Sequence, residues 1–530
     1  MRFFNTAGPV NCEDHYCLPP LSRFNLAEIL GLISQKKYFV LHAPRQTGKT
    51  SCLLALMEYL NQEGRYCALY ANVEAAQGAR ENVGEAMRAI IGEISEEGRI
   101  HLKDTALGEI AEDAWQRQGP YNALNHLLTR WAESLRRPIV LMIDEIDSLV
   151  GDTLISVLRQ LRTGYARRPR SFPSTVLLCG VRDVRDCRIH SDRDKVVITG
   201  GSAFNIKAES LRLGNFSRQD IETLYSQHTV DTGQIFEPEA LDKAWDLTAG
   251  QPWLVNALAY EACFRMPEGR DRSRPVTCEM ISQAKENMIS RRETHLDQLA
   301  DKLREARVRR VIEPLLAGET KPEQPSEDDV QYVADLGLIT TVGQMRISNE
   351  IYREVIPRVL TYTTQITIAQ EPAWYIQPDG RLSLSKLLEA FQQFFREHSE
   401  IWLERFDYRE AGAQLLLQAF LQRIVNGGGR VEREYGLGRG RTDLLVIWPF
   451  SGGVQRAVIE LKVLRRSRAR TMQEGLAQTR EYSDRCGADE AHLVIFDRTP
   501  GKPWSRKIFR KQALYPAPDG KDLAIGVWGM

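Results

Sequence analysis

The stretch that most constrains the fold is residues 43–50, with the sequence Ala-Pro-Arg-Gln-Thr-Gly-Lys-Thr. A β-rich apolar run, residues 38–42, precedes it, and residues 51–60 after it carry apolar side chains at helical spacing. Strand, loop and helix are the context in which a phosphate-binding loop is credible, although Ala43 replaces the usual first glycine. Consecutive backbone N–H groups and a helix N-terminus form an anion-binding concavity. The stretch therefore predicts a nucleoside triphosphate site.

Each residue of this loop has a predicted place at the phosphates. Lys49 brings a positive charge to the β- and γ-phosphates, and Thr50 brings a hydroxyl group to Mg²⁺. The remaining loop residues are expected to surround the phosphates: Ala43, Pro44, Arg45, Gln46, Thr47 and Gly48. ATP and Mg²⁺ are therefore the predicted cofactors.

A second signal lies about 95 residues further on. Residues 139–143 are five consecutive apolar residues, which fits a strand buried on both faces of a parallel sheet, and Asp144 and Glu145 follow at its carboxyl end. We expect Asp144 to join the Mg²⁺ shell and Glu145 to orient or deprotonate the attacking water. The alternative is that both acids cap the next helix.

The segment before the loop is irregular and rich in proline. Such a lead-in often wraps the base of a nucleotide, and Tyr16 and Arg23 are the candidates for base contacts. A packing role for the same residues is the alternative.

A helical region after the sheet ends in Gly250-Gln-Pro252. With this motif the chain resembles the AAA+-related ATPases that include origin-recognition, archaeal-type and STAND signalling ATPases, over roughly residues 1–360. The resemblance implies that Gly250 and Pro252 of a helical lid face the nucleotide. It also implies that Arg182 or Asp183, after the apolar strand 174–180, senses the γ-phosphate. No arginine lies beside the lid motif, so the lid-borne arginine sensor of many relatives is not expected.

Assembly through the ATPase domain into a homo-oligomer is a further expectation. Arg167, Arg168 and Arg170 can reach a neighbouring subunit as arginine fingers, and a solvated basic loop is the alternative.

Two helices and a hairpin between residues 308 and 349 form a winged-helix pattern, which the same ATPases carry. Winged helices can read DNA through a basic helix. This one carries four acids, Glu327, Asp328, Asp329 and Asp335, which argue against a surface that faces phosphates. An internal packing or protein-contact role is favoured.

The C-terminal part reads as helix, three strands, helix and strand. The strand-like pieces are residues 430–435, 442–448, 457–464 and 491–496, with helices over residues 410–424 and 472–486. This αβββαβ order resembles the PD-(D/E)XK, or restriction-endonuclease-like, fold over roughly residues 405–500.

The charged residues agree with that resemblance. Glu460 and Lys462 are two apart on one strand and so share a face, and Asp443 begins the strand before. Asp443 and Glu460 make an oxygen site suited to Mg²⁺ or Mn²⁺, and Lys462 can position the attacking water. Glu410 or Glu434 completes the metal shell. The alternative is a surface strand of alternating charge, or a degenerate nuclease kept for binding.

A helix motif and a basic stretch favour a polyanionic substrate. Gln478 and Tyr482 lie four apart on the second helix and match the Gln-x3-Tyr element of recombination nucleases. Between residues 430 and 470 ten Lys and Arg face four Asp and Glu, a local charge of 10 − 4 = +6. Four arginines directly after the site can grip DNA phosphates, with a solvated loop as the alternative: Arg465, Arg466, Arg468 and Arg470.

Overall composition limits which partners and which cellular location are expected. The chain has 530 residues and a net charge of zero, so no global field draws it to nucleic acid. No apolar run approaches the roughly 18 residues of a membrane span, and a cytoplasmic location without membrane contact is expected. Most of the nine cysteines lie in apolar contexts typical of reduced core thiols. Cys12 and Cys17, with His15 between them, lack a second pair and are not predicted to hold a metal.

The predicted fold class is α/β, with a P-loop NTPase parallel sheet, a helical lid, a winged helix and a C-terminal αβββαβ domain. The predicted boundaries are 1–205 for the ATPase core, 206–300 for the lid, 301–362 for the winged helix, 363–404 for a linker and spacer, and 405–530 for the nuclease-like domain. The predicted function is an ATP-hydrolysing switch that controls a metal-dependent DNA nuclease, in prokaryotic defence or genome maintenance. One alternative is a signalling ATPase whose C-terminal domain binds nucleic acid or protein without cleavage, and another is a DNA-translocating motor.

Overall fold

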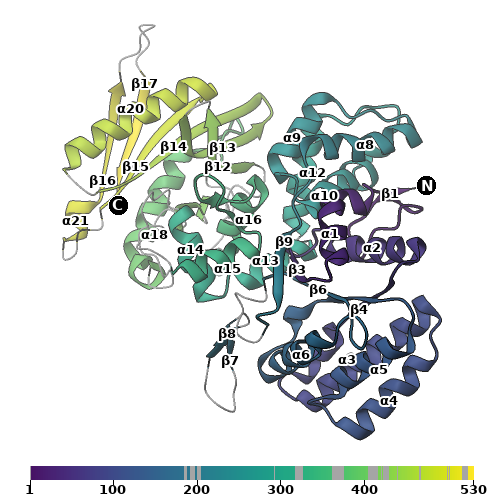
Figure 1. The fold of residues 1–530 in the computed structure, drawn as a ribbon. Helices are drawn as coiled ribbons and strands as arrows, with labels where there is room; N and C mark the ends of the chain where they lie inside the picture. The colour runs from purple at the N-terminus through teal and green to yellow at the C-terminus, as the bar shows by residue number, and fades with distance from the viewer. Residues whose placement is uncertain are drawn as a thin grey trace. The chain divides into compact units, whose positions relative to one another are not determined.

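A computed structural model (Figure 1) describes residues 2–183, 188–190, 197–199, 204–291, 293–316, 326–360, 375–403, 416–418, 420–421, 429–437, 440–464, 467–497, 499, 502–515 and 523–530. The chain divides into two compact units. The first contains residues 1–291 and 330–341, and the second contains residues 292–329 and 342–530. No helix among the described residues is both long and apolar enough to cross a membrane.

A five-stranded parallel sheet organises the first unit. Its strand order is β4-β5-β6-β3-β9. The strands are β3 (Tyr38–His42), β4 (Cys67–Asn72), β5 (Ile139–Asp144), β6 (Thr175–Gly180) and β9 (Lys207–Arg212). Every residue of β5 and β6 is buried, as expected of strands with helices on both faces. The predicted α/β class with a parallel sheet is confirmed.

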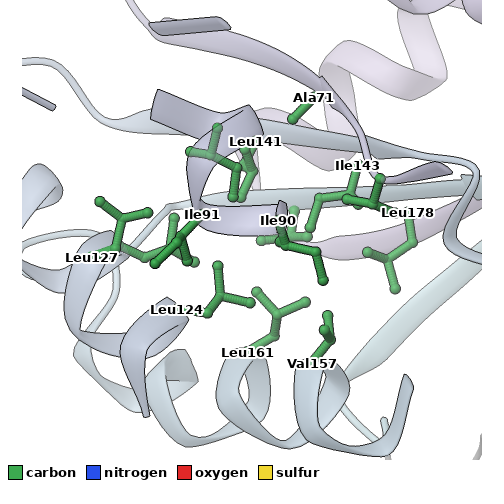
Figure 2. Packing of buried hydrophobic residues seen from close by; sticks show 14 of the residues in the cluster. Ala71, Ile90, Ile91, Leu124, Leu127, Leu141, Ile143, Val157, Leu161 and Leu178 are labelled. Carbon is green, nitrogen blue, oxygen red and sulfur yellow. The ribbon is translucent and has the colours of Figure 1, made fainter. Parts of the chain in front are cut away.

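Two helical layers cover this sheet. Helices α1 (Leu26–Ser34) and α2 (Lys49–Glu63) pack against one face. The opposite face is covered by α3 (Val83–Leu102), α4 (Ala106–Gln118), α5 (Ala123–Ser134) and α6 (Gly151–Gly164). Alternate residues of β5 point to opposite faces of the sheet. Met142 therefore packs with α1 and α2, whereas Leu141 and Ile143 pack with the helices of the opposite face. Figure 2 shows Leu141 and Ile143 above the side chains of these helices.

A group of helices follows the sheet. It includes α8 (Arg218–Thr232), α9 (Pro238–Thr248), α10 (Pro252–Tyr260), α11 (Pro267–Arg270) and α12 (Cys278–Arg291). Ser217 caps α8 in a reciprocal arrangement with Asp220.

The N-terminal lead-in is held by its own strand pair. The strands β1 (Phe3–Phe4) and β2 (His15–Tyr16) pair in parallel. Cys12 and Cys17 form a disulfide, which the expectation of reduced thiols did not include. The buried Cys52 and Cys179 are free thiols, as predicted.

The predicted winged-helix elements occur in the expected order. They are α14 (Ala306–Leu316), α15 (Glu327–Asp335), β10 (Ile339–Thr340) and β11 (Arg346–Ile347). Helices α13 (Thr294–Lys302) and α16 (Glu350–Leu360) flank them in sequence.

A six-stranded mixed sheet dominates the second unit, in the order β12-β13-β14-β15-β17-β16. Its strands are β12 (Arg430–Leu437), β13 (Gly440–Phe450), β14 (Gly453–Val463), β15 (Glu490–Phe496), β16 (Phe509–Tyr515) and β17 (Leu523–Gly529). Strands β12, β13 and β14 pair antiparallel, whereas β14, β15 and β17 run parallel. The three strands, one helix and fourth strand expected from the sequence are present, and β16 and β17 were not expected.

Helices cover both faces of this sheet. Helix α20 (Arg468–Cys486) lies over one face, and α18 (Leu384–Leu403) packs its leucines and phenylalanines on the other (Figure 1). Thus α18, expected in a spacer, contributes to the core of this sheet. Most of the helix predicted over residues 410–424, and the linker 361–374, lie outside the described residues.

The close packing of Gly164 gives a test of the first unit. A Cβ added there would lie 2.2 Å from the ring of Phe172, which is fully buried. We expect Gly164→Ala to destabilise the fold by about 1–3 kcal/mol through overpacking. Gly92 of α3 is exposed with open space around it, so Gly92→Ala is the matched control and should stabilise slightly. Urea unfolding measures both, and equal stability of the two variants would contradict this packing.

Candidate functional site

The phosphate loop connects β3 to α2 in a conformation that few side chains tolerate. Gln46 has φ of 57° and Gly48 has φ of 92°, and Gly48 is the N-cap of α2. Lys49 is 6% exposed, and its Nζ donates to the carbonyl oxygens of Ala43 at 3.0 Å and Pro44 at 3.1 Å. The loop thus folds around the amine of Lys49 at the N-terminus of a helix, which suits a phosphate chain.

A buried carboxylate joins the loop to β5. Thr50 donates its hydroxyl to Asp144 Oδ2 at 2.8 Å, and the hydroxyl of Tyr70 donates to the same oxygen at 3.1 Å. The backbone N–H of Glu145 donates to the other oxygen at 3.0 Å. A hydroxyl and a carboxylate are oxygen donors that fit Mg²⁺. The structure brings Thr50 and Asp144 together as predicted. Tyr70, which the sequence reasoning missed, reaches them because β4 is the neighbour of β5.

Glu145 lies next to this pair in the left-handed region, with φ of 57°. Burial raises the pKa of its carboxyl group, although the positive charge of Lys49 opposes the shift. A raised pKa makes the carboxylate a better proton acceptor, which is useful in a residue expected to act on water.

A pocket of about 710 Å³, a volume that includes its mouth, lies beside the loop. Its lining combines the lead-in, the phosphate loop and the lid helices, and includes Tyr16, Gly48, Pro252 and Trp253. Trp253, which the sequence reasoning missed although it follows Pro252, donates its indole N–H to the carbonyl of Thr6 at 2.8 Å.

The two predicted base contacts have different surroundings. Tyr16 is buried at the pocket wall, and its hydroxyl lies 3.2 Å from Nδ1 of His228. Arg23 also lines the pocket, but its guanidinium donates to the carbonyls of Thr47 at 3.2 Å and Gly214 at 2.7 Å. Arg23 therefore ties the phosphate loop to the start of the lid, a contact that sequence spacing does not reveal.

The lid motif requires its glycine. Gly250 has φ of 73°, and a Cβ there would lie 1.9 Å from the carbonyl oxygen of Phe216. The backbone N–H of Phe216 donates to the carbonyl of Gly250 at 2.8 Å. Pro252 begins α10 and lines the pocket, whereas Gly250 packs against the backbone of Phe216.

The predicted γ-phosphate sensor contacts the segment 330–341. Arg182 lies 3.8 Å from the buried carboxylate of Asp335 and 4.8 Å from the ring centre of Tyr332. Arg212 donates to the carbonyl of Ala334 at 3.1 Å. The alternative sensor, Asp183, forms a buried ion pair with Lys207 at 2.6 Å.

The same segment reaches the phosphate loop. A Cβ added at Gly337 would lie 2.7 Å from Cγ of Pro44. Residues 330–341 therefore touch the loop as well as the sensor, and the sequence reasoning anticipated only a packing or protein-contact role for their helix.

Two of the three predicted arginine fingers, Arg167 and Arg168, contact residues of the first unit. Arg168 lies 3.3 Å from the ring centre of Tyr165, and Arg167 donates to Oδ1 of Asn125. Arg170 is exposed.

In the second unit, Glu460 and Lys462 form a close ion pair. Lys462 Nζ donates to Glu460 Oε1 at 2.6 Å, and Glu460 is 3% exposed. Leu444 pairs with Ile459 across the antiparallel strands β13 and β14. Asp443 and Glu460 are the residues next to this pair on their two strands. The side chain of Asp443 lies outside the described residues, as does all of Glu410. Within the described residues no three His, Cys, Asp or Glu side chains gather at a metal site.

Helix α20 covers the same sheet face. Tyr482 packs on Leu445 and Val458, and Val458 shares the face of Glu460. Gln478 lies one turn earlier, and its Oε1 is buried without a hydrogen-bond donor among the described residues. The predicted Gln-x3-Tyr element thus lies over the Glu460 face.

Two of the four predicted DNA-binding arginines are described. Arg468 stacks over Phe509 at 4.2 Å from the ring centre, and Arg470 pairs with Glu474 on the helix surface at 2.9 Å. Arg465 and Arg466 lie outside the described residues.

Known proteins resemble parts of this chain. The family model described as "AAA domain" matches residues 32–187. Among solved structures, the Walker-type ATPase PABY2304 of Pyrococcus abyssi is similar over 67% of this chain and 99% of its own, at 14% identity and a TM-score of 0.45. Cdc6p from Pyrobaculum aerophilum is similar over 65% of this chain and 93% of its own, at 14% identity and a TM-score of 0.34. No curated protein matches. The chain therefore carries an AAA-type P-loop ATPase domain in its first unit.

Proposed function

We propose that this protein is a STAND-like switch in which ATP binding and hydrolysis control a metal-dependent nuclease that cleaves DNA. The observation that carries the proposal is the presence, in one chain, of an AAA domain and of the ion pair between the buried Glu460 and Lys462 on the third strand of a mixed sheet. A role in prokaryotic defence or genome maintenance suits this pairing of activities.

The nucleotide half uses residues that already contact one another. Lys49 would hold the β- and γ-phosphates, and Thr50 with Asp144 would hold Mg²⁺, which neutralises phosphate charge when it is bound. Glu145, whose pKa burial raises, would take the proton of the attacking water. Pro252 and Trp253 bring the lid to the same pocket.

The switch half rests on the contact between Arg182 and Asp335. A γ-phosphate that attracts Arg182 competes with the carboxylate of Asp335 for the same guanidinium group. Such competition couples the nucleotide state to the position of residues 330–341, because a ligand shifts an equilibrium by its differential affinity for two states. Hydrolysis would restore the Asp335 contact.

The nuclease half needs a divalent cation and a positioned water. Asp443 and Glu460, with Glu410 or Glu434, would hold Mg²⁺ or Mn²⁺, which lowers the pKa of bound water. Lys462 would orient that water or stabilise charge on the phosphate. Because the carboxylate of Glu460 is buried, it requires a positive partner, and a cation bound to Glu460 would free Lys462 for the substrate. DNA as the substrate and a homo-oligomer of the ATPase domain complete the proposal.

The Asp335 contact predicts a gain of activity. We expect Asp335→Asn to raise ATP turnover or nucleotide exchange about fivefold or more, since typical coupling energies have that size. Glu327→Gln on the exposed start of α15 is the matched control. Steady-state phosphate release and nucleotide dissociation measure both effects. Unchanged rates in Asp335→Asn would remove this contact from the switch.

The nuclease assignment predicts cleavage that depends on Lys462. We expect the purified protein to cut linear, circular or single-stranded DNA with Mg²⁺ or Mn²⁺, in the presence or absence of ATP. Lys462→Ala and Glu460→Ala should each reduce the rate about a hundredfold or more, as the loss of one transition-state contact does. Glu481→Ala, which removes an exposed acid of α20, should cut at the wild-type rate. No cleavage under any of these conditions would favour a non-cleaving binding domain.

A further inference from the structure

The edge of the C-terminal sheet is strongly basic. Residues 499–515 contain five Lys and Arg and no Asp or Glu: Lys502, Arg506, Lys507, Arg510 and Lys511. They belong to α21 (Trp504–Lys507), the edge strand β16 and the turn before them. The sequence reasoning did not use this segment.

Strand register connects this edge to the Glu460–Lys462 pair. Glu460, Leu493, Val527 and Lys511 are successive partners across β14, β15, β17 and β16, and Lys462, Ile495, Gly529 and Phe509 form the next row. Partners in neighbouring strands point to the same face, so Lys511 and Phe509 share the α20 face with the pair. Three strand spacings separate the two ends, a distance of about 15 Å.

The outer end of these rows is held in place by Arg468. Gly529 leaves room for the ring of Phe509, because a Cβ there would lie 2.0 Å from Cε1. Arg468 stacks over that ring and donates to the carbonyl of Arg506 at 2.8 Å. The first turn of α20 and the short helix α21 are thereby joined at the sheet edge.

The basic residues on the two faces of β16 differ in whether they pair with an acidic residue. Lys511 and Arg506 are exposed, and neither forms an ion pair with a carboxylate of the described residues. Arg510, one residue from Lys511, points to the opposite face. It stacks over Trp528 at 4.7 Å and pairs with Glu389 of α18 at 3.5 Å. Lys511, which shares the face of Glu460 and Lys462, thus carries an uncompensated positive charge, and Arg506 of α21 adds a second one at the same sheet edge.

We infer that Arg468, Arg506 and Lys511 form a phosphate-binding track for the DNA that flanks the cleaved phosphodiester. The inference rests on the proposed nuclease function. Helix α20 covers the middle of the two rows, because its Gly475 packs against Leu493. DNA cannot lie on the covered part of the sheet, so we place the track along the carboxyl ends of β14, β15 and β17. A reach of about 15 Å corresponds to about four base pairs of duplex, at 3.4 Å per step.

Binding to labelled DNA without cleavage tests this track. Fluorescence anisotropy of the full-length protein with a short duplex, and with one of its strands, is measured in EDTA between about 50 and 200 mM salt. We expect Lys511→Ala and Arg506→Ala each to weaken binding about fivefold and to reduce the salt slope by about one. Arg510→Ala removes an equal charge from the opposite face and should bind as the wild type does. Circular dichroism confirms that each variant is folded.

The outcomes separate the track from the nuclease. Wild-type affinity and salt slope in the Lys511→Ala/Arg506→Ala double variant would overturn the track, and cleavage by that variant at the wild-type rate would leave the nuclease standing. Equal losses in Arg510→Ala and Lys511→Ala would overturn it as well, because net charge alone would then explain them. A wild-type protein that binds no DNA would overturn both the track and the proposed substrate.

Discussion

The hydrogen bond from Thr50 to Asp144 is the interaction on which the first unit depends. It joins the start of α2 to the end of β5, and its two residues are 94 positions apart in sequence. It exists because β5 and β6 run parallel to β3, so that their carboxyl ends meet the phosphate loop at one edge. Around this bond the structure collects Lys49, Tyr70 and Glu145. A fully buried carboxylate needs such donors, and a nucleotide site needs the same groups.

The contacts of residues 330–341 extend this site to a segment that belongs to the winged-helix pattern. Asp335 is buried against Arg182, and Gly337 packs on Pro44. One segment therefore contacts both Arg182, the predicted sensor, and the phosphate loop. This contact accounts for one of the acids of the helix, Asp335. The carboxylate has an internal arginine to bind, and this arginine is the residue that a γ-phosphate would attract.

Local patterns in the sequence predicted much of this architecture. The phosphate loop and the strand before Asp144 and Glu145 both follow from residue spacing. The Gly-x-Pro segment could be found because backbone geometry at Gly250 excludes a side chain. Contacts between distant segments were not predictable in the same way. The bond of Tyr70 to Asp144, the carbonyl contacts of Arg23 and the Asp335 contact depend on tertiary packing, which no local pattern records. Likewise β16 and β17 lack a motif, although the absence of acids in residues 499–515 marked their region as basic.

The central claim is that the nucleotide state of the first unit controls DNA cleavage by the second. The most direct measurement is the rate of DNA cleavage, with Mg²⁺ and ATP, in Glu145→Gln and Lys49→Ala of the full-length protein. Glu145→Gln should retain bound ATP and Lys49→Ala should bind it poorly, so the account predicts clearly different cleavage rates, both abolished by Glu460→Ala. Equal cleavage by the two variants, with or without ATP, would contradict control by the nucleotide.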